Sequence, residues 1–241
     1  MPISKNFTSI LSNDCEINFL QCYPNGYLKY TDLCNLLQLT AGHHAELGGI
    51  SFTDMQQYHQ AWVLSKMRVE IHQLPQWRDV ITVKTWINSL ENSRSVRCLE
   101  MYLGGTKIVG CETFWAVINT KLRKPEALAL PHAHFEKYPE RATEQSFSRI
   151  QLPELPDVLE TYTVKLSDLD VVNHANNVKY LEWCLDHCDT EALLQQKLKA
   201  FEMNFMRELS LGDTAVIGKH DDTFVITHKD KACFALQLEW H

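Results

Sequence analysis

The fold of this chain is decided by residues 167–186, SDLDVVNHANNVKYLEWCLD. They begin where a short alternation of apolar and polar side chains ends, a pattern typical of a strand. The apolar members of that alternation are Tyr162, Val164 and Leu166. After a polar elbow at residues 168–177, apolar side chains recur at helical spacing, at Val178, Leu181, Leu185 and Cys188. The stretch therefore predicts a strand, an elbow and a helix, with polar groups gathered where the helix begins.

Polar and ionisable side chains crowd this elbow. Asp170 and His174 lie four residues apart, and the amides of Asn173, Asn176 and Asn177 lie beside them. The first backbone N–H groups of a helix have no partner within it and favour a negative group, so the elbow suits an oxyanion. Asp and Asn are also usual helix caps, and a His among them is often scaffold. The pattern alone leaves both interpretations open.

The elbow resembles the Asp-x-Asn-x-His-x-Asn-Asn-x-x-Tyr signature of the acyl-ACP thioesterases, a branch of the hot-dog-fold thioesterases. Placement without a gap aligns the signature with Asp170, His174, Asn176, Asn177 and Tyr180. The chain departs from the signature at one position. Val172 stands where the family usually has its first Asn, and Asn173 follows one place later.

Length and composition predict an ordinary globular protein. The chain has 241 residues, of which 45% are hydrophobic and 22% charged, enough to bury the core of one large or two small domains. No apolar run approaches the roughly 20 residues of a membrane-spanning helix, and the N-terminal residues lack the apolar core of a signal peptide. We therefore expect a cytoplasmic protein without membrane insertion.

Cysteine spacing and net charge exclude further classes. The eight cysteines are scattered without close CxxC pairs, which indicates reduced thiols and predicts neither a metal site nor a redox cofactor. A net charge of −7 argues against binding to nucleic acid, because no excess of Lys and Arg is present to displace phosphate counterions. An acidic protein partner would need a local basic patch.

The first half of the chain predicts one helix followed by antiparallel strands. Residues 30–47 have helical periodicity and end at Gly48-Gly49. Period-two patterns then predict strands at residues 61–72, 79–87, 94–103 and 106–119, and Gly104-Gly105 joins the last two as a hairpin. In the first of these strands Met67, Val69 and Ile71 alternate with the polar residues Lys66, Arg68, Glu70 and His72.

The second half repeats this order after a proline-rich connector at residues 121–156, for which we expect at most a turn or two of helix. Its strands are predicted near residues 201–209, 213–219, 223–228 and 232–240. Residues 67–79 align with residues 201–213 without a gap, and residues 28–30 with residues 178–180. The spacing between these blocks differs, which places an insertion at residues 43–60. A duplicated unit of helix and sheet is the simplest explanation.

The resemblance implies an α+β tandem hot-dog fold for such a duplication. Two long helices would each be wrapped by a curved antiparallel sheet, and the sheets would join side by side. The domains would be an N-terminal unit at residues 1–130 that binds the acyl chain, a linker at residues 131–156 and a catalytic C-terminal unit at residues 157–241. The resemblance also implies that two such tandem chains pair as a homodimer.

The activity that the resemblance implies is hydrolysis of fatty acyl-ACP thioesters to free fatty acid and holo-ACP, which ends chain elongation in fatty acid biosynthesis. Asp170 would orient water or attack the carbonyl, and His174 would carry the proton. Glu208, which matches the family's Arg-Glu pair, would position water or tune the imidazole. Strand alternation places Glu208 on one face with Glu202, Asn204 and Met206. Leu209 stands where some members are assigned a cysteine nucleophile, so a thiol mechanism from that position is excluded.

The amides of Asn173, Asn176 and Asn177 are candidates for pantetheine binding or for support of the elbow, and the backbone amides of residues 176–178 for oxyanion donors. The elbow's first-half counterpart, taken as residues 26–33, has Tyr, Lys and Thr where the elbow has Asp, Asn and His, so we expect the first unit to hold the acyl chain. Its candidate walls are Leu33, Leu36, Leu37, His44, Met67, Val69 and Ile71. The candidate docking residues for acyl carrier protein are Lys121, Arg123, Lys124, Arg141 and Arg149.

Three alternatives stay open at this point. An acyl-CoA thioesterase would use the same groups. A non-catalytic protein that binds acyl chains or their carrier would be consistent with Val172 at a usual catalytic position. A dehydratase on the same fold would require an arrangement of His and acid that the elbow does not show.

Overall fold

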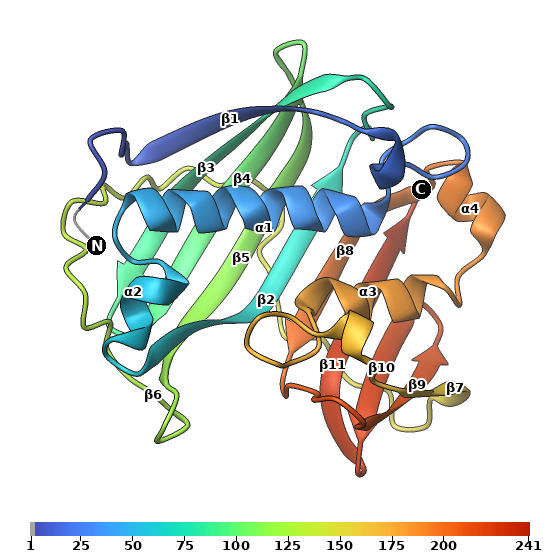
Figure 1. Cartoon of the computed structure of the whole chain (residues 1–241). Coiled ribbons are helices and arrows are strands. Elements are labelled where there is room, and N and C mark those ends of the chain that lie inside the picture. The colour runs from blue at the N-terminus through green and yellow to red at the C-terminus, as the bar shows by residue number, and fades with distance from the viewer. Residues whose placement is uncertain (1–2) are drawn as a thin grey trace. The chain divides into compact units, whose positions relative to one another are not determined.

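The computed structural model describes residues 3–241, which divide into two compact units. Unit 1 contains residues 3–65 and 69–146, and unit 2 contains residues 66–68 and 147–241. Each unit consists of one main helix lying against an antiparallel sheet, as the sequence predicted (Figure 1). Within residues 3–241, no helix has both the length and the apolar character needed to cross a membrane.

Unit 1 is built on the helix α1 (Tyr30–Leu47), whose predicted bounds are confirmed. Its strands are β1 (Ile10–Glu16), β2 (Gln60–Ile71), β3 (Val80–Glu91), β4 (Arg94–Leu103), β5 (Thr106–Asn119) and the short β6 (Lys124–Pro125). The order in the sheet is β1-β3-β4-β5-β2, and β6 pairs with β5. The Gly104-Gly105 hairpin between β4 and β5 is confirmed. The sequence analysis missed β1, the 3-10 turn η1 (Phe19–Gln21) and the short helix α2 (Phe52–Gln56).

Helix α1 packs on β3 through the face that the helical periodicity indicated. Leu33, Leu37, Ala41 and His44 are buried on that face, whereas Leu36 is only half-buried. The helix ends as expected, because Gly48 caps it and Gly49 adopts a φ of 70°, a left-handed conformation that glycine favours.

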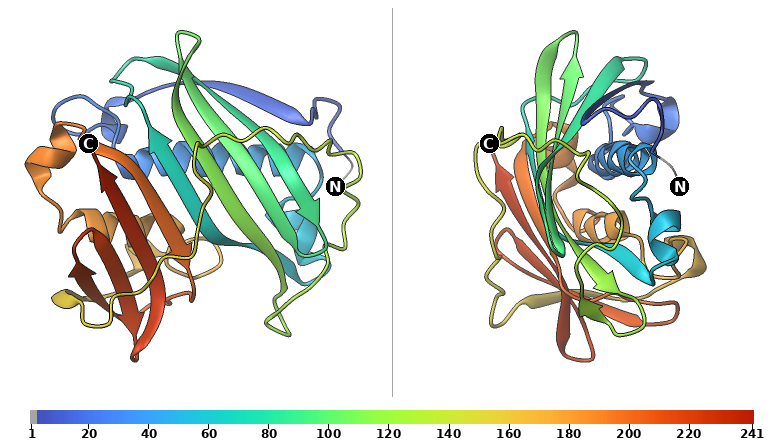
Figure 2. Two further views of the ribbon diagram at one scale, coloured as in Figure 1. Left: turned by 180° about the vertical axis from the view of Figure 1, so that it is seen from behind. Right: turned by 90° about the vertical axis from the view of Figure 1, so that its left-hand side faces the viewer.

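The connector after β6 lies across the face of the unit 1 sheet opposite α1 (Figure 2). Glu70, one of the polar residues that alternate along β2, is only 9% exposed. Its carboxylate accepts hydrogen bonds from the backbone N–H groups of Glu144 (2.6 Å) and Gln145 (3.1 Å). The expected turn of helix in the connector is absent from residues 121–156, which form only β6 and irregular structure. Both faces of the sheet are therefore covered.

Gly110 marks the closest approach of the connector to β5. A Cβ atom built on Gly110 would lie 2.0 Å from the carbonyl oxygen of Ala142. The same carbonyl accepts a hydrogen bond from Nζ of Lys107 at 2.7 Å. Ala142 also packs in a small cluster with Trp86 and Cys98. A residue without a side chain is needed at this position of β5 because the connector backbone occupies its space.

Unit 2 has the strands β7 (Asp157–Thr163), β8 (Leu198–Phe205), β9 (Thr214–His220), β10 (Thr223–His228) and β11 (Lys231–Trp240). Their order is β8-β11-β10-β9-β7. Its main helix is α3 (Asn177–Leu185), which packs on β11, and it also has the 3-10 turn η2 (Leu166–Asp168) and the short helix α4 (Thr190–Leu194). Two predictions were too long: β7 ends before Val164 and Leu166, and α3 ends before Cys188.

The loops that precede the two main helices have the same hydrogen bonds. In unit 1, Tyr23 N–H donates to Tyr27 O (2.8 Å) and Gly26 N–H to Tyr23 O (2.9 Å). In unit 2, the equivalent bonds run from Asp170 N–H to His174 O (2.8 Å) and from Asn173 N–H to Asp170 O (3.1 Å). The duplicated unit is thus visible in the backbone. The sequence alignment of this block was wrong by three residues, because Leu28 corresponds to Ala175 and not to Val178.

Candidate functional site

The elbow of unit 2 is a turn whose shape depends on Asn173. Asn173 has a φ of 65°, and its unit 1 equivalent Gly26 has a φ of 83°. Among residues other than glycine, Asn is one of the few that enter this left-handed region at low energy. This conformation accounts for Asn173 by backbone geometry, which agrees with support of the elbow, one of the two roles that the sequence had left open. The turn places Asp170 and His174 at its two ends.

Asp170 is held by the elbow's own backbone. Its Oδ1 accepts hydrogen bonds from the N–H groups of Val172 (2.9 Å) and His174 (3.2 Å). Hydrogen bonds of this kind fix the orientation of the carboxylate. Among residues 3–241, no group is hydrogen-bonded to Oδ2 of Asp170. One oxygen of a fixed carboxylate is therefore available to a substrate or to water.

His174 lies against Glu208, which comes from a different segment of unit 2. Nδ1 of His174 is 3.4 Å from Oε2 of Glu208, and the two side chains are 30% and 35% exposed. The two segments are fixed by the hydrogen bond from Ala175 N–H to Leu209 O (2.8 Å). Within the part of the chain that the structure describes, Nε2 of His174 has no hydrogen-bond partner. The imidazole thus presents one nitrogen to the glutamate and keeps the other for chemistry.

The position of Glu208 differs in one respect from the expectation. Strand β8 ends at Phe205, so Glu208 lies in the loop that follows and not on a strand face with Glu202 and Asn204. Those two side chains bind the connector instead, since Glu202 accepts from Ser148 N–H and Asn204 accepts from Ile150 N–H at 3.1 Å. Because Glu208 lies beyond the end of β8, its side chain is not held on a strand face and can approach His174 in the elbow.

The remaining amides of the elbow act at the start of α3. Asn176 caps the helix, because its Oδ1 accepts a hydrogen bond from Val178 N–H at 3.0 Å. Its own N–H donates to Asp168 O at 2.8 Å. The backbone amides of Asn176 and Val178 are therefore occupied within the elbow, and for residues 176–178 the role of oxyanion donor stays a prediction. Asn177 is the first residue of α3 and is half-buried.

Asp168, Tyr162 and Tyr180 hold the elbow and the loop of Glu208 in place, a role that sequence reasoning did not assign to them. Asp168 is 3% exposed, and its Oδ2 accepts hydrogen bonds from the Tyr162 hydroxyl (2.8 Å) and from Lys165 N–H (2.7 Å). Burial, together with this bond to Asp168, raises the pKa of Tyr162 to about 12. The hydroxyl of Tyr180 accepts from Leu209 N–H at 2.9 Å, and burial raises the pKa of Tyr180. Both phenols remain neutral and fix the segments that carry Asp170 and Glu208.

The same positions in unit 1 lack ionisable groups suited to this chemistry. Tyr23 and Tyr27 occupy the places of Asp170 and His174. The loops that follow β2 and β8 can be matched by a shared hydrogen bond. The Asp79 carboxylate accepts from Gln76 N–H (2.7 Å), and the Asp213 carboxylate accepts from Ser210 N–H (2.9 Å), so residues 76 and 79 correspond to residues 210 and 213. In that register the equivalent of Glu208 is Leu74, which is 1% exposed.

The side chains predicted to line an acyl-chain tunnel are placed in the core. Leu33, Leu37, His44, Met67 and Val69 are completely buried. Ile71 is 6% exposed, and Leu36 is half-buried. None of these seven residues lines the pocket that the structure shows in unit 1.

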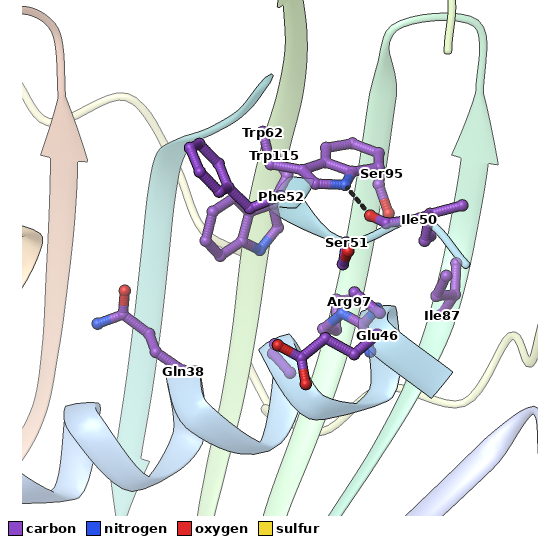
Figure 3. Close-up of a pocket in the computed structure, with 13 residues that line it drawn as sticks. Gln38, Glu46, Ile50, Ser51, Phe52, Trp62, Ile87, Ser95, Arg97 and Trp115 are labelled. Atoms are coloured by element: carbon purple, nitrogen blue, oxygen red, sulfur yellow. Dashed lines mark hydrogen bonds between the residues drawn. The ribbon is translucent and has the colours of Figure 1, made fainter. Parts of the chain in front are cut away.

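That pocket has a volume of about 290 Å³ and lies at the C-terminal half of α1 (Figure 3). Its aromatic and aliphatic walls come from α2, the adjoining loop and three strands. The residues that line it are Gln38, Ala41, Gly42, Ala45, Glu46, Ile50, Ser51, Phe52, Trp62, Ile87, Ser95, Arg97 and Trp115. The sequence analysis did not identify these residues as a site. The available signal was Arg97, which alternates with Ser95, Leu99 and Met101 in the buried register of β4.

Arg97 and His44 form a buried polar pair beside the pocket. Nη1 of Arg97 lies 2.7 Å from Nδ1 of His44 and 3.2 Å from Oγ1 of Thr85. A guanidinium only donates, so Nδ1 of His44 accepts and Nε2 donates to Thr8 O at 2.9 Å. Burial and the adjacent Arg97 charge lower the pKa of His44 to about 3. Burial lowers the pKa of Arg97 to about 10, so the arginine is charged and the histidine neutral at pH 7.

The basic residues predicted to bind a carrier protein differ in their surroundings. Lys121 and Arg123 are exposed on the turn between β5 and β6 in unit 1, and Lys124 is the exposed first residue of β6. Arg141 is bound to Glu112, with Nε to Oε1 at 2.9 Å and Nη2 to Oε2 at 2.5 Å. Arg149 is exposed in unit 2. Arg141 thus neutralises a buried carboxylate of β5.

The thiol of α3 belongs to the core of unit 2. Cys184 is buried, and burial raises its pKa well above the usual value. Nε2 of His187 contacts Oε2 of Glu160 at 3.0 Å. No group of three or more His, Cys, Asp or Glu side chains within residues 3–241 is arranged as a metal site.

Comparison with known proteins gives a consistent family. The family described as "Acyl-ACP thioesterase N-terminal domain" matches residues 10–130, and "Acyl-ACP thioesterase C-terminal domain" matches residues 156–236. The chain is 27% identical over 220 residues to the oleoyl-acyl carrier protein thioesterase of Coriandrum sativum, covering 80% of this chain and 58% of that protein. It is 27% identical over 189 residues to the palmitoyl-acyl carrier protein thioesterase of Cuphea hookeriana, covering 72% and 46%. The chain thus spans about half the length of the curated relatives it matches.

Solved structures share the fold. An acyl-ACP thioesterase from Bacteroides thetaiotaomicron superposes with a TM-score of 0.88 at 24% identity, covering 97% of this chain and 98% of that one. The 12:0-ACP thioesterase from Umbellularia californica gives a TM-score of 0.82 at 17% identity, covering 97% and 98%. At these identities the likeness establishes the fold, which is the tandem hot-dog fold that the sequence predicted.

Proposed function

Because the chain belongs to the acyl-ACP thioesterase family, we propose that it hydrolyses the thioester bond of fatty acyl groups carried on acyl carrier protein. The products would be a free fatty acid and the carrier with a free pantetheine thiol. The observation that carries this proposal is the meeting of Asp170, His174 and Glu208 at one elbow of unit 2. These groups suit attack on a carbonyl carbon and transfer of the proton to the departing sulfur.

In the proposed reaction, water adds to the thioester carbonyl carbon while Asp170 Oδ2 accepts one of its hydrogen bonds and orients it. His174 Nε2 takes the proton that the water loses, and Glu208 beside Nδ1 stabilises the imidazolium that forms. The C–S bond then breaks, and His174 returns the proton to the sulfur. We favour water over direct attack by Asp170, because two backbone N–H groups already stabilise its carboxylate and make it a weaker nucleophile.

Unit 1 has a different part in the proposal. It lacks the Asp, His and Glu of the elbow and has a pocket with largely apolar walls, which supports acyl-chain binding in this unit. Each methylene group buried there would contribute about 0.8 kcal/mol, so the depth of the apolar space would set the preferred chain length.

The partner in this proposal is an acidic acyl carrier protein. The net charge of −7 on this chain repels an acidic partner overall. Docking would therefore depend on the local positive charge of Lys121, Arg123 and Lys124, which are exposed at the turn between β5 and β6 and at the start of β6. We also propose that the chain forms a homodimer, which sedimentation equilibrium would test directly.

The decisive experiment is a thiol-release assay with a series of acyl-ACP substrates of increasing chain length. Asp170→Asn should retain the two backbone hydrogen bonds and lower kcat by about 10² to 10⁴, because only the charge is lost. Asp189→Asn is the matched control, since Asp189 also accepts a backbone N–H, that of Glu191 at 2.9 Å, away from the elbow. Parental activity in Asp170→Asn would remove this residue from the mechanism. The same series on coenzyme A tests the related acyl-CoA activity.

A further inference from the structure

The pocket of unit 1 contains a buried positive charge that the proposed hydrolysis does not use. Arg97 is 6% exposed and lines the pocket, yet both of its side-chain hydrogen bonds come from Nη1. Their acceptors, His44 and Thr85, are neutral. Nε and Nη2 have no hydrogen-bond partner in the described part of the chain. Because Arg97 lines the pocket, these two nitrogens are the guanidinium donors that remain for a ligand there.

The charge balance around this guanidinium is incomplete. The other charged residue of the pocket is Glu46, whose side chain is exposed on α1 and forms no ion pair with Arg97 (Figure 3). A buried charge without an opposite charge is unfavourable, and a ligand that supplies one gains both the Coulomb attraction and two charge-assisted hydrogen bonds. The planar nitrogens of an arginine match a carboxylate in a bidentate geometry. The hydroxyl of Ser95, which is also buried and lines the pocket, offers a further donor.

The rest of the pocket suits a hydrocarbon chain. Trp62 donates its indole N–H to Ile50 O at 3.1 Å, and Trp115 donates its own to Thr113 Oγ1 at 2.9 Å. With both indole N–H groups satisfied, these side chains offer carbon surfaces to an occupant. Ile87 and Phe52 add to these apolar walls. A volume of about 290 Å³ is close to the lower limit for small-molecule sites, about 300 Å³.

We propose that this pocket binds an alkyl chain that ends in a carboxylate, with the carboxylate paired to Arg97 and the chain along Trp62 and Trp115. Two molecules have this chemistry: a free fatty acid, and an acyl chain that carries a second carboxylate at its far end. A plain methyl end against Arg97 would remove water from the guanidinium without replacing its hydrogen bonds. Binding of a free fatty acid does not depend on the proposed hydrolysis. Binding of an acyl chain with a second carboxylate rests on that proposed function.

The test is isothermal titration of the full chain with decanoate and with decanol, which differ in charge and share the alkyl chain. Decanoate should bind at least about 10-fold more tightly than decanol, because only it pairs with the guanidinium. Arg97→Met should remove this difference and Arg97→Lys should retain part of it. Arg94→Met, at an exposed position of the same strand, should bind like the parent. Glu46→Gln should tighten decanoate binding, because it removes the negative charge beside the pocket.

A second measurement needs no variant and remains decisive if Arg97→Met does not fold. The ¹³C chemical shift of the carboxyl group of [1-¹³C]decanoate is followed against pH by NMR on the parent protein. The bound carboxyl group should stay ionised to a lower pH than the free one, since a neighbouring arginine favours the carboxylate. Equal affinity for decanoate and decanol, or a bound carboxyl that titrates like the free acid, would overturn the proposal.

The two sources are separated by turnover. If the ligand is an acyl chain with a far carboxylate, 9-carboxynonanoyl-ACP should be hydrolysed faster than decanoyl-ACP, and Arg97→Met should reverse that order. If it is a free fatty acid, decanoate should inhibit the parent and not Arg97→Met, with decanoyl-ACP the better substrate. Failure of hydrolysis with every substrate, with decanoate still bound at Arg97, would refute the proposed function and leave the binding site standing.

Discussion

Nδ1 of His174 lies 3.4 Å from Oε2 of Glu208, although the two residues belong to an elbow and to a loop that are separated along the chain by α3, α4 and β8. The contact depends on backbone pairing between the two segments, in which Ala175 N–H donates to Leu209 O. A carboxylate on one nitrogen of an imidazole orients the ring and stabilises its protonated form. This relationship gives the first prediction.

Glu208→Gln should lower kcat for acyl-ACP by about 10²-fold with little change in KM, because the amide keeps the shape of the side chain and loses the charge that stabilises the imidazolium. Glu160→Gln is the matched control, since Glu160 pairs with His187 at 3.0 Å elsewhere in unit 2. Steady-state kinetics on both variants measure the effect. Equal activity of the two variants would show that Glu208 has no part in proton transfer.

The choice between water and Asp170 as the attacking group can be read from isotope incorporation. A single turnover in H₂¹⁸O should place the label in the fatty acid and none in Asp170, because the attacking oxygen comes from solvent. Mass spectrometry of the peptide that contains Asp170 measures this. Label in that peptide after repeated turnover would instead establish a covalent acyl-aspartate intermediate.

Charge reversal on the turn between β5 and β6 should weaken carrier docking. The triple variant Lys121→Glu, Arg123→Glu and Lys124→Glu should lower kcat/KM for acyl-ACP by about 10-fold at low salt and leave acyl-CoA hydrolysis unchanged. The loss should shrink as salt is added, since screening weakens the attraction in the parent enzyme. A similar loss with both substrates would contradict docking at this turn. Arg141 is left unchanged because its contact with Glu112 is structural.

Stability should fall as the pH is lowered, in part through His44. Its pKa is about 3 in the folded protein and about 6.5 when unfolded, so between these values the unfolded chain binds a proton that the folded chain excludes. The free energy of unfolding should therefore rise with pH across this window, by at most about 1.4 kcal/mol per pH unit from this residue. Urea unfolding of the parent and of His44→Gln, between pH 5 and pH 7, tests this. The glutamine can still bond to Arg97 and Thr8, and its slope should be shallower.

Gly110→Ala should destabilise unit 1, because the added Cβ would overlap the carbonyl of Ala142 and push the connector off the sheet. We expect a loss of about 1–3 kcal/mol in the free energy of unfolding. Gly42→Ala is the control, since nothing lies within 4 Å of a Cβ built on Gly42 in α1. That variant should gain up to about 1 kcal/mol from helix propensity. Thermal unfolding of both variants checks the prediction, and equal shifts would contradict it.

Local pattern was sufficient for much of the fold. The helical period of residues 30–47 and the Gly104-Gly105 turn are set by neighbouring residues, so α1 and the β4–β5 hairpin lie where the sequence predicted. The candidate group of Asp170, His174 and Glu208 also came from sequence, through its resemblance to a family signature. Predictions from local pattern were wrong where a residue's position depends on contacts with distant segments of the chain. Strand alternation placed Glu208 on one face with Glu202 and Asn204, yet β8 ends at Phe205 and Glu208 lies in the loop that follows.

The sequence by itself determined the duplicated unit of helix and sheet, because periodicity and turn chemistry act between residues close in the chain. Only the tertiary structure showed that Asn173 shapes the elbow, that Glu208 leaves its strand to approach His174, and that Arg97 lines a pocket. Each of these depends on which backbone comes near from another part of the chain. Hydrogen bonds and charge pairs act over a few ångströms, so their partners are fixed only when the sheet brings those segments together.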